Sequence, residues 1–390
     1  MGGAIAVLLV STSVLGGGGG FSGATTLRTG DDDVDVVLSD AATNGDRVAV
    51  GWQEERVGGP ELFYRLSDDG GATFAATKTV DSRDSREMRM DICAGYVWSA
   101  YALHTDDADP GEWEIVLEGN DVDGSGFIGA LLTDPFEPTV GRFPDVACIG
   151  SVRTITAWID EVDDPGDRVL IRIDPIDPPV KGPPPPPSYE YDLPAGEFSE
   201  VAVAGTADRA YAAWVRDNRL RIKRFEIGPG PDSLVTTFPT LVLGEDIQPT
   251  GEMHMTAWGS NVALVYASFA DTFVRVSTDG GQSFGPRERL LDGLYATEFG
   301  TGGTSLDLRG SKILVHGIVV NGGNPFDVQV DQFRFRSSNL GSTWSGTQLG
   351  EQGRRMGVHT VVVGDVREVE AWDETFTDAM NQRIRFRRQL

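Results

Sequence analysis

One pattern of hydrophobic and polar positions repeats seven times along the chain. Each repeat contains a short apolar strand, a glycine turn, and a second strand in which apolar and polar residues alternate. The turn glycines lie 50 to 55 residues apart and are Gly45, Gly95, Gly150, Gly205, Gly259, Gly310 and Gly364. Four of the second strands end in tryptophan, namely Trp52, Trp158, Trp214 and Trp372. Alternation of this kind predicts half-buried β-strands.

A third alternating strand follows each second strand, as in LFYRLS, EIVLEG and RIRFRR, and a weaker fourth strand usually comes next. Four short antiparallel strands in about 53 residues match the size of one propeller blade. The 49 glycines and 21 prolines also favour turns over helices. The sequence therefore predicts an all-β fold over residues 21–390: a single seven-bladed β-propeller with four-stranded antiparallel blades.

The two ends of this patterned region complement each other. The last repeat stops at Leu390 after its third strand, and the segment Phe21–Arg28 resembles fourth-strand segments such as Phe74–Val80. We therefore expect the N-terminal strand to complete the last blade and close the ring. Deleting residues 21–30 should then destabilise the protein more than an ordinary tail deletion does.

Three repeats carry a sharper motif between their third and fourth strands. The motif residues are Ser67, Asp69, Gly71 and Phe74; Ser277, Asp279, Gly281 and Phe284; and Ser337, Asn339, Gly341 and Trp344. These segments resemble the Asp box, S-x-D-x-G-x-T-W, of the sialidase-like and BNR-repeat propellers. The resemblance implies that they are peripheral turns. The side-chain oxygen bonds the turn backbone, the glycines supply positive φ, and the aromatic ring packs between sheets. We expect a structural role for them.

Composition narrows the classes of partner. The chain has 59 acidic and 33 basic residues, and its net charge of −26 repels phosphate backbones and anionic membranes. Nucleic acid is therefore excluded as an expected partner. Acidic loops can bind Ca²⁺, but a solvated charged surface explains them more simply, and we expect no cofactor and no metal site. The stretch Asp121–Gly126 begins like an EF-hand loop, yet Leu132 stands where a glutamate belongs.

Residues 1–20 are expected to be a leader and linker. The stretch Ala4–Leu15 is apolar but too short to span a bilayer, and five glycines follow it. It resembles the core of a signal peptide that lacks a basic start; a disordered apolar tail is the alternative. The expected location is secreted or at the cell surface, with no membrane span and a monomeric state.

Cys93 and Cys148 lie 55 residues apart, at equivalent positions two residues before their turn glycines. A disulfide between them would suit an exported protein and would stabilise it by about 3–4 kcal/mol in the chain-entropy model. Equivalent positions around a ring tend to point the same way, so two buried free thiols remain the alternative.

Candidate chemistry lies in the loops that join one blade to the next and in those after the second strand. Arg89, Arg142 and Arg355 are the candidates for an arginine clamp that binds a sugar acid. In the sialidase-like family a tyrosine activated by a glutamate is the nucleophile, and Tyr295 with Glu298 is the matching pair.

Two features weigh against a sialidase. The F/Y-R-I-P motif of that family is absent, and in the segment Gly141–Pro144 the arginine precedes the aromatic residue. Structural ion pairs with acidic loops also explain the arginines. Our first hypothesis is therefore an exported, non-enzymatic propeller that binds a glycan or an extracellular protein through its loop face. The alternative is a sialidase-like glycoside hydrolase.

Overall fold

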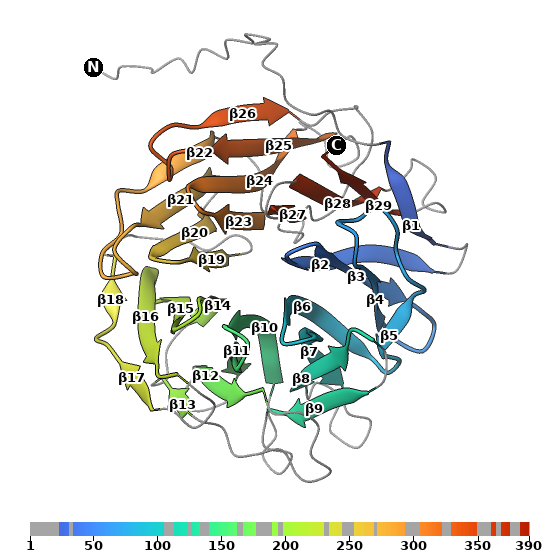
Figure 1. The fold of residues 1–390 in the computed structure, drawn as a ribbon, viewed down its shortest axis with the longest axis horizontal. Helices are drawn as coiled ribbons and strands as arrows, with labels where there is room; N and C mark the ends of the chain where they lie inside the picture. Colours follow the sequence, from blue (N-terminus) through green and yellow to red (C-terminus); the bar gives the residue numbers. More distant parts are fainter. Residues whose placement is uncertain are drawn as a thin grey trace.

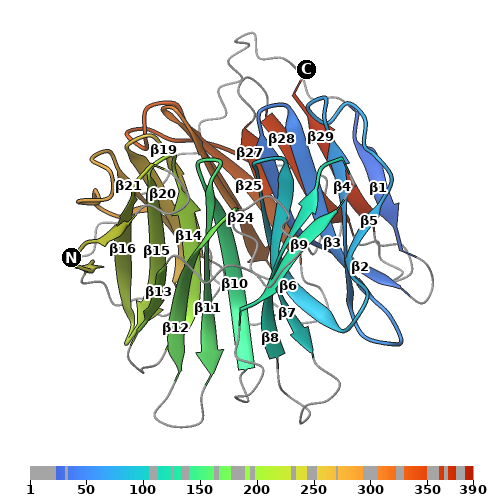
Figure 2. The same ribbon diagram turned by 60° about the horizontal axis from the view of Figure 1, so that its bottom comes forward.

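The computed structural model describes residues 23–30, 34–104, 113–123, 126–132, 140–161, 167–176, 189–193, 198–229, 234–243, 253–268, 271–292, 305–321, 329–348, 360–363, 368–374 and 383–389. All elements in these ranges are β-strands, so the chain is all-β over the part described. The sheets radiate from a common centre (Figure 1), and Figure 2 shows their strands standing side by side around that axis. No helix in the described ranges is long and apolar enough to cross a membrane.

Consecutive strands pair antiparallel within each sheet, in chain order from the centre outward. The first sheet contains β2 (Asp35–Asn44), β3 (Arg47–Glu55), β4 (Glu61–Ser67) and β5 (Lys78–Asp81). The next set contains β6 (Ser85–Cys93), β7 (Tyr96–His104), β8 (Trp113–Asp121) and β9 (Phe127–Leu131). It is followed by β10 (Val140–Ile149), β11 (Arg153–Glu161), β12 (Arg168–Pro175) and β13 (Tyr189–Asp192). A single parallel pairing, between Val140 and Trp113, joins these last two sets into one eight-stranded sheet.

The second half of the chain repeats the same order. One sheet contains β14 (Phe198–Gly205), β15 (Arg209–Arg216), β16 (Arg219–Ile227), β17 (Val235–Thr237) and β18 (Leu241–Val242), the last two both pairing with β16. The next contains β19 (His254–Trp258), β20 (Asn261–Ser268), β21 (Asp271–Ser277) and β22 (Glu288–Asp292). Another contains β23 (Ser305–Arg309), β24 (Lys312–Asn321), β25 (Gln329–Ser337) and β26 (Ser345–Gln348). The last strands are β27 (Thr360–Val363), β28 (Glu368–Glu374) and β29 (Arg383–Arg388).

The N-terminal strand β1 (Thr25–Thr29) is the outer strand of this last sheet. It pairs antiparallel with β29, in the sheet order β1–β29–β28–β27. Leu27 is buried there, and the Arg28 guanidinium donates hydrogen bonds of 2.7 and 3.1 Å to the carboxylate of Glu54 on the neighbouring β3. The expected pairing between the two ends of the chain is therefore present, and Arg28 ties it to the first sheet.

The innermost strands of the sheets surround the centre (Figure 1). β2, β6, β10, β14, β19, β23 and β27 each contact the next, and β27 contacts β2. Each innermost strand begins after the loop from the preceding sheet and ends at the turn that leads to the second strand of its own sheet. We call these two ends of the central channel the loop end and the turn end. Trp52, Trp158, Trp214 and Trp372 are buried on the second strands.

Apolar side chains fill most contacts between neighbouring sheets in the described ranges. Ile155 and Ile171, for example, pack with Trp214 between β10–β13 and β14–β18. The contact between β25 and β28 is instead ionic. It contains two buried carboxylates, Glu368 and Glu370, which are each 1% exposed. Their cationic partners are Lys312, Arg334, Arg336 and Arg387.

The three box-like segments fold as the same turn. The Ser67 hydroxyl accepts a hydrogen bond from the Gly71 N–H (2.8 Å), and Asp69 accepts one from the Thr73 N–H (2.8 Å). The equivalent bonds form around Ser277 and Ser337. Gly71 has a φ of 80°, and Phe74 packs edge-on against Phe386 of the last sheet at 4.8 Å. The hydrogen bonds, the positive φ and the packing expected for these turns are present.

Candidate functional site

The innermost strands line a central cavity of about 1060 Å³. Its walls come from the C-terminal halves of β2, β6, β10 and β14, from β19 and β23, and from turn residues that include Gly45, Gly150, Gly205 and Gly259. The cavity therefore lies toward the turn end, opposite the loops in which the sequence placed the candidate chemistry. A volume near 1000 Å³ is at the upper end of the range for ligand pockets.

Three aspartates link successive innermost strands along one wall of the cavity. One carboxylate oxygen of each accepts a hydrogen bond from the N–H of the next residue, and the other accepts one from the following innermost strand. Asp40 of β2 bonds the Met90 N–H (2.7 Å), Asp91 of β6 bonds the Cys148 N–H (2.7 Å), and Asp145 of β10 bonds the Val203 N–H (2.8 Å). We call these three residues the carboxylate wall.

The pKa values of all three carboxyl groups in the carboxylate wall are raised. Burial raises the pKa of Asp91 to about 6, and the neighbouring carboxylates Asp40 and Asp145 add to the increase. Burial likewise raises the pKa of Asp145 to about 6 and raises that of Asp40, although Arg89 opposes the shift at both. All three residues keep part of their surface accessible. The wall is thus a set of coupled carboxyl groups, two of which, Asp91 and Asp145, change charge around pH 6.

Arg89 on β6 and His254 on β19 also line the cavity. Both lie near enough to Asp40 and Asp145 to favour their ionised forms. Of the two proposed clamp arginines that the structure describes, Arg89 lines this cavity and Arg142 does not. It faces carboxylates there, as a structural ion pair would.

The opposite side of the cavity carries an exposed tryptophan. Trp258, at the end of β19, is 44% exposed, and the Arg309 guanidinium of β23 lies over its ring at 4.7 Å from the centroid. Both residues line the cavity. Large aromatic side chains are normally buried or partnered, so an indole exposed at a cavity mouth is a candidate contact for a ligand.

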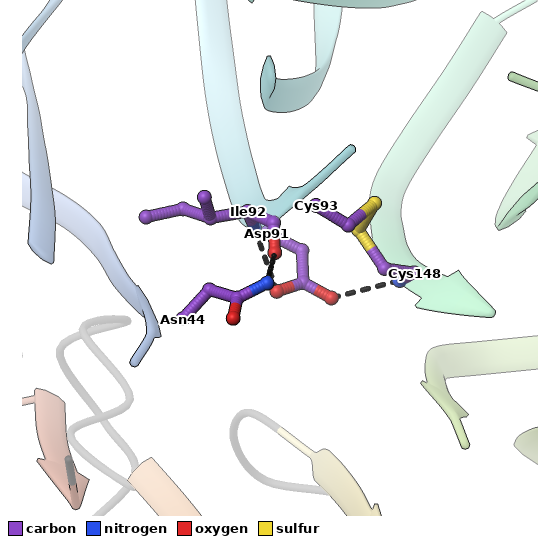
Figure 3. Close-up of a disulfide and its surroundings, with 5 residues drawn as sticks. All are labelled: Asn44, Asp91, Ile92, Cys93 and Cys148. Carbon is purple, nitrogen blue, oxygen red and sulfur yellow. Dashed lines mark hydrogen bonds between the residues drawn. A yellow bond between two sulfur atoms is a disulfide. The ribbon is translucent and has the colours of Figure 1, made fainter. Parts of the chain in front are cut away.

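A disulfide braces the carboxylate wall. Cys93 of β6 and Cys148 of β10 are bonded, with their Cα atoms 6.1 Å apart (Figure 3). The alternative of two free thiols is wrong, because innermost strands of adjacent sheets approach closely near the axis. The Asn44 amide reaches across from β2 and donates to the Ile92 carbonyl at 2.8 Å. β2, β6 and β10 are therefore joined by side chains as well as by packing.

The loop end carries a different cluster, centred on Arg142. Its guanidinium pairs with Glu161 at 3.0 Å, and the neighbouring Phe143 N–H donates to the Glu87 carboxylate at 2.8 Å. Glu87 and Phe143 have φ values of 59° and 51°, a strained conformation for these residue types. Nearby, Arg86 stacks on Trp113 at 3.7 Å from the ring centroid. Arg142 belongs to this loop-end cluster and is not among the residues that line the central cavity.

Other loop-end carboxylates are also paired. Glu54 is bound by Arg28 and Arg56, and Asp160 by Arg168. Burial raises the pKa of Glu161, with Arg142 opposing the shift. Arg355, Tyr295 and Glu298 lie outside the described residues. Within the described part of the chain, no group of three His, Cys, Asp or Glu side chains is arranged to hold a metal ion.

The carboxylate wall and Trp258 were not among the residues predicted from the sequence. A signal for the wall exists: Asp40, Asp91 and Asp145 each stand four or five residues before a turn glycine, in three successive repeats. A charge at that repeated position requires a partner or a function. Trp258 could have been found as the tryptophan that stands directly before its turn glycine rather than after it.

No protein-family model matches the chain, and no curated protein matches its sequence. Several solved structures, in contrast, have a fold similar to that of this chain. The BP39L lectin from Burkholderia pseudomallei aligns with a TM-score of 0.56 at 9% identity, covering 90% of this chain and 95% of the lectin. The Dos1 propeller gives a TM-score of 0.48 at 9% identity, covering 93% and 94%.

A sialidase from Trypanosoma rangeli, solved with sialic acid, gives a TM-score of 0.49 at 9% identity. The alignment covers 95% of this chain but 59% of the sialidase, so the chain spans about three-fifths of that protein's length. At these identities the likeness concerns the fold alone, which is that of a β-propeller.

Proposed function

We propose that this chain is a non-enzymatic, seven-bladed Asp-box propeller, closed by its N-terminal strand, that binds a glycan in its central cavity at the turn end. The observation that carries the proposal is Trp258, whose indole is 44% exposed at a cavity of about 1060 Å³. The proposal moves the binding site of the first hypothesis from the loop end to the turn end.

The chemistry of the cavity suits a sugar. A pyranose ring presents a face of C–H groups, which packs on an aromatic ring, and a rim of hydroxyls, which need hydrogen-bonding partners. Trp258 supplies the aromatic surface. The guanidinium of Arg309 beside it supplies donors, and the carboxylates of Asp91 and Asp145 across the cavity supply acceptors. The cavity volume admits more than one sugar unit.

The fold and the disulfide support the remaining parts of the proposal. The lectin that aligns with the chain shows that such a propeller is used for sugar binding in another protein, which is an argument from fold alone. A disulfide persists in oxidising compartments, which suits a secreted or cell-surface protein. We propose that it acts there as a monomer.

No observation in the described residues favours the alternative of a sialidase-like hydrolase. Its arginine clamp would need Arg142 free, but Arg142 is paired with Glu161 at the loop end. Arg89 faces carboxylates in a different part of the molecule. The described positions therefore support binding better than glycoside hydrolysis.

The test is a glycan array, followed by calorimetric titration of the strongest hits. Wild type should bind, Trp258→Ala should lose at least about tenfold in affinity, equal to 1.4 kcal/mol, and Phe127→Ala should bind like wild type. Phe127 is a matched control, an exposed aromatic on the outer strand β9. Equal binding by Trp258→Ala would reject the site, and turnover of a fluorogenic sialoside would reject the non-enzymatic function.

A further inference from the structure

The two sides of the cavity differ in character. Asp40, Asp91 and Asp145 lie on β2, β6 and β10, whereas Trp258 and Arg309 lie on β19 and β23. Figure 1 shows these two groups of strands on opposite sides of the central opening. A ligand that stacks on Trp258 and crosses the opening therefore meets carboxylates on the far side.

We infer that the ligand is a cationic amino sugar, whose ring packs on Trp258 while its ammonium group lies against the carboxylate wall. The inference rests on the proposed function and names the class of glycan bound by that same site. An ammonium group donates up to three hydrogen bonds, and each carboxylate oxygen has a second lone pair beyond the one that accepts a backbone N–H.

The cations already present leave room for another. Arg89 and His254 are the basic residues that interact with the wall at Asp40 and Asp145. Arg309 lies over Trp258 on the other side, and the guanidinium of Arg209 lies against Gly280. Asp208 and Asp307 add two further acidic residues to the lining. The lining therefore carries more acidic than basic residues.

The same balance disfavours acidic sugars. A sugar carboxylate would be placed in a cavity lined by three coupled aspartates, inside a chain whose net charge is −26. Like charges at close range in a partly desolvated site repel strongly. The cavity is therefore selective in the sense opposite to that of a sialic-acid site.

Because the carboxylate wall binds protons, the affinity for a cationic amino sugar should depend on pH. At pH 7 the three carboxyl groups and their neighbours Arg89 and His254 leave an excess of negative charge. At pH 5 Asp91 and Asp145 take up protons, because burial raises the pKa of both to about 6. An amino sugar is more fully charged at pH 5, yet it should bind more weakly there.

The experiment compares three probes by calorimetry at pH 7 and pH 5: a glucosamine tetramer, its N-acetylated counterpart, and sialyllactose. At pH 7 the glucosamine tetramer should bind at least about tenfold more tightly than the N-acetylated tetramer, since one well-placed ionic hydrogen bond is worth about that factor. The preference should disappear at pH 5. Asp91→Asn should lower it to less than threefold at pH 7, and Asp69→Asn, in a peripheral turn, should leave it unchanged.

The outcomes separate the two proposals. If no probe and no array glycan binds, the proposed function fails. If the N-acetylated tetramer binds as tightly as the glucosamine tetramer, the inference fails while the proposed function stands. Tightest binding of sialyllactose would overturn the inference directly. If Asp91→Asn does not fold, the pH dependence of wild type decides, because loss of preference at pH 5 requires the carboxyl groups to take up protons.

Discussion

Asp91 at the centre of the molecule and Asp69 at its periphery both accept hydrogen bonds from backbone N–H groups, but their pKa values move in opposite directions. Burial beside Asp40 and Asp145 raises the pKa of Asp91 to about 6. Hydrogen bonds from the Thr73 N–H and hydroxyl hold the pKa of the exposed Asp69 at about 2. The same residue type is thus poised to change charge at the centre and fixed in its charge at the periphery.

The comparison shows that the residues of the recognisable motif and those of the proposed binding site occupy different regions. The box-like turns have a motif because their geometry demands specific side chains, and the hydrogen bonds to the Asp69 carboxylate come from within its own turn. The carboxylate wall has no such motif, since each of its members bonds a different strand. If the periphery stabilises the fold and the centre binds, changes in the two regions should have separable effects.

The largest effect is expected from deleting residues 21–30 at the periphery. The deletion removes β1, exposes the edge of β29, and leaves the buried Glu54 without Arg28. Leaving a buried charge partly unpaired costs about 3–5 kcal/mol, and lost burial adds to it. Urea unfolding should show a loss of about 5 kcal/mol or more. Deleting residues 2–20 is the control, and an equally small change in both variants would contradict the role of β1.

A somewhat smaller loss of stability is expected from removing the disulfide at the centre. Replacing Cys93 and Cys148 by serine releases a 55-residue loop, for which the chain-entropy model gives about 4 kcal/mol. Unfolding of the double variant should match that of reduced wild type. Glycan affinity should also fall, because the disulfide braces β6 against β10. An unchanged midpoint in both samples would show that the bond contributes nothing.

The comparison itself predicts two opposite dependences of stability on pH. Asp91, with a raised pKa, contributes stability that is present below pH 4 and lost as the pH rises through 6. Asp69, with a lowered pKa, contributes stability that is present above pH 4 and lost as the pH falls through 2. The combined contribution of these two groups to the stability of wild type should therefore be greatest between about pH 4 and 5.

Two variants isolate these contributions in urea unfolding between pH 2 and pH 8. Asp91→Asn should abolish a loss of about 1.4 kcal/mol between pH 5 and pH 8, since the pKa of about 6 lies one unit above pH 5 and each pKa unit is worth about that much. Asp69→Asn should leave that loss intact and flatten the decline below pH 4. A loss at high pH that persists undiminished in Asp91→Asn would place the titrating groups elsewhere.

The smallest effect is expected from single substitutions in the peripheral turns. Asp69→Ala removes exposed hydrogen bonds within one turn and should cost about 0.5–1 kcal/mol. Glycan binding should not change. Thermal unfolding and calorimetry together check both statements, and a loss of binding in Asp69→Ala would break the separation of centre from periphery.

Much of the fold followed from the sequence because its devices are local and repeated. Alternating strands, turn glycines and the box-like turns are each specified within a few residues, and the pairing of β1 with β29 followed from a fourth strand that the last repeat lacks and the N-terminal segment supplies. The ionic contact of Glu368 and Glu370 with Arg334 could not be predicted, because it depends on which sheet faces which.

The candidate site was less accessible for a related reason. Arg89 and Arg142 were chosen alike, as arginines entering innermost strands, but a β-bulge in each strand reorients the residues around it. Arg89 lines the central cavity, and Arg142 pairs with Glu161 at the loop end. A bulge shifts alternation by one residue, and single-sequence patterns do not specify where it falls. The turn end was overlooked because its residues look like ordinary strand ends.

The most direct test of the central claim is where a bound glycan lies. Protein labelled with ¹⁵N at its tryptophan indoles is titrated with the strongest array hit, and Trp258→Phe assigns one resonance among the eight tryptophans. Trp113, stacked under Arg86 at the loop end, reports on the other face. The account predicts that the Trp258 resonance shifts to saturation while that of Trp113 stays in place. A shift of Trp113 with Trp258 unmoved would contradict it.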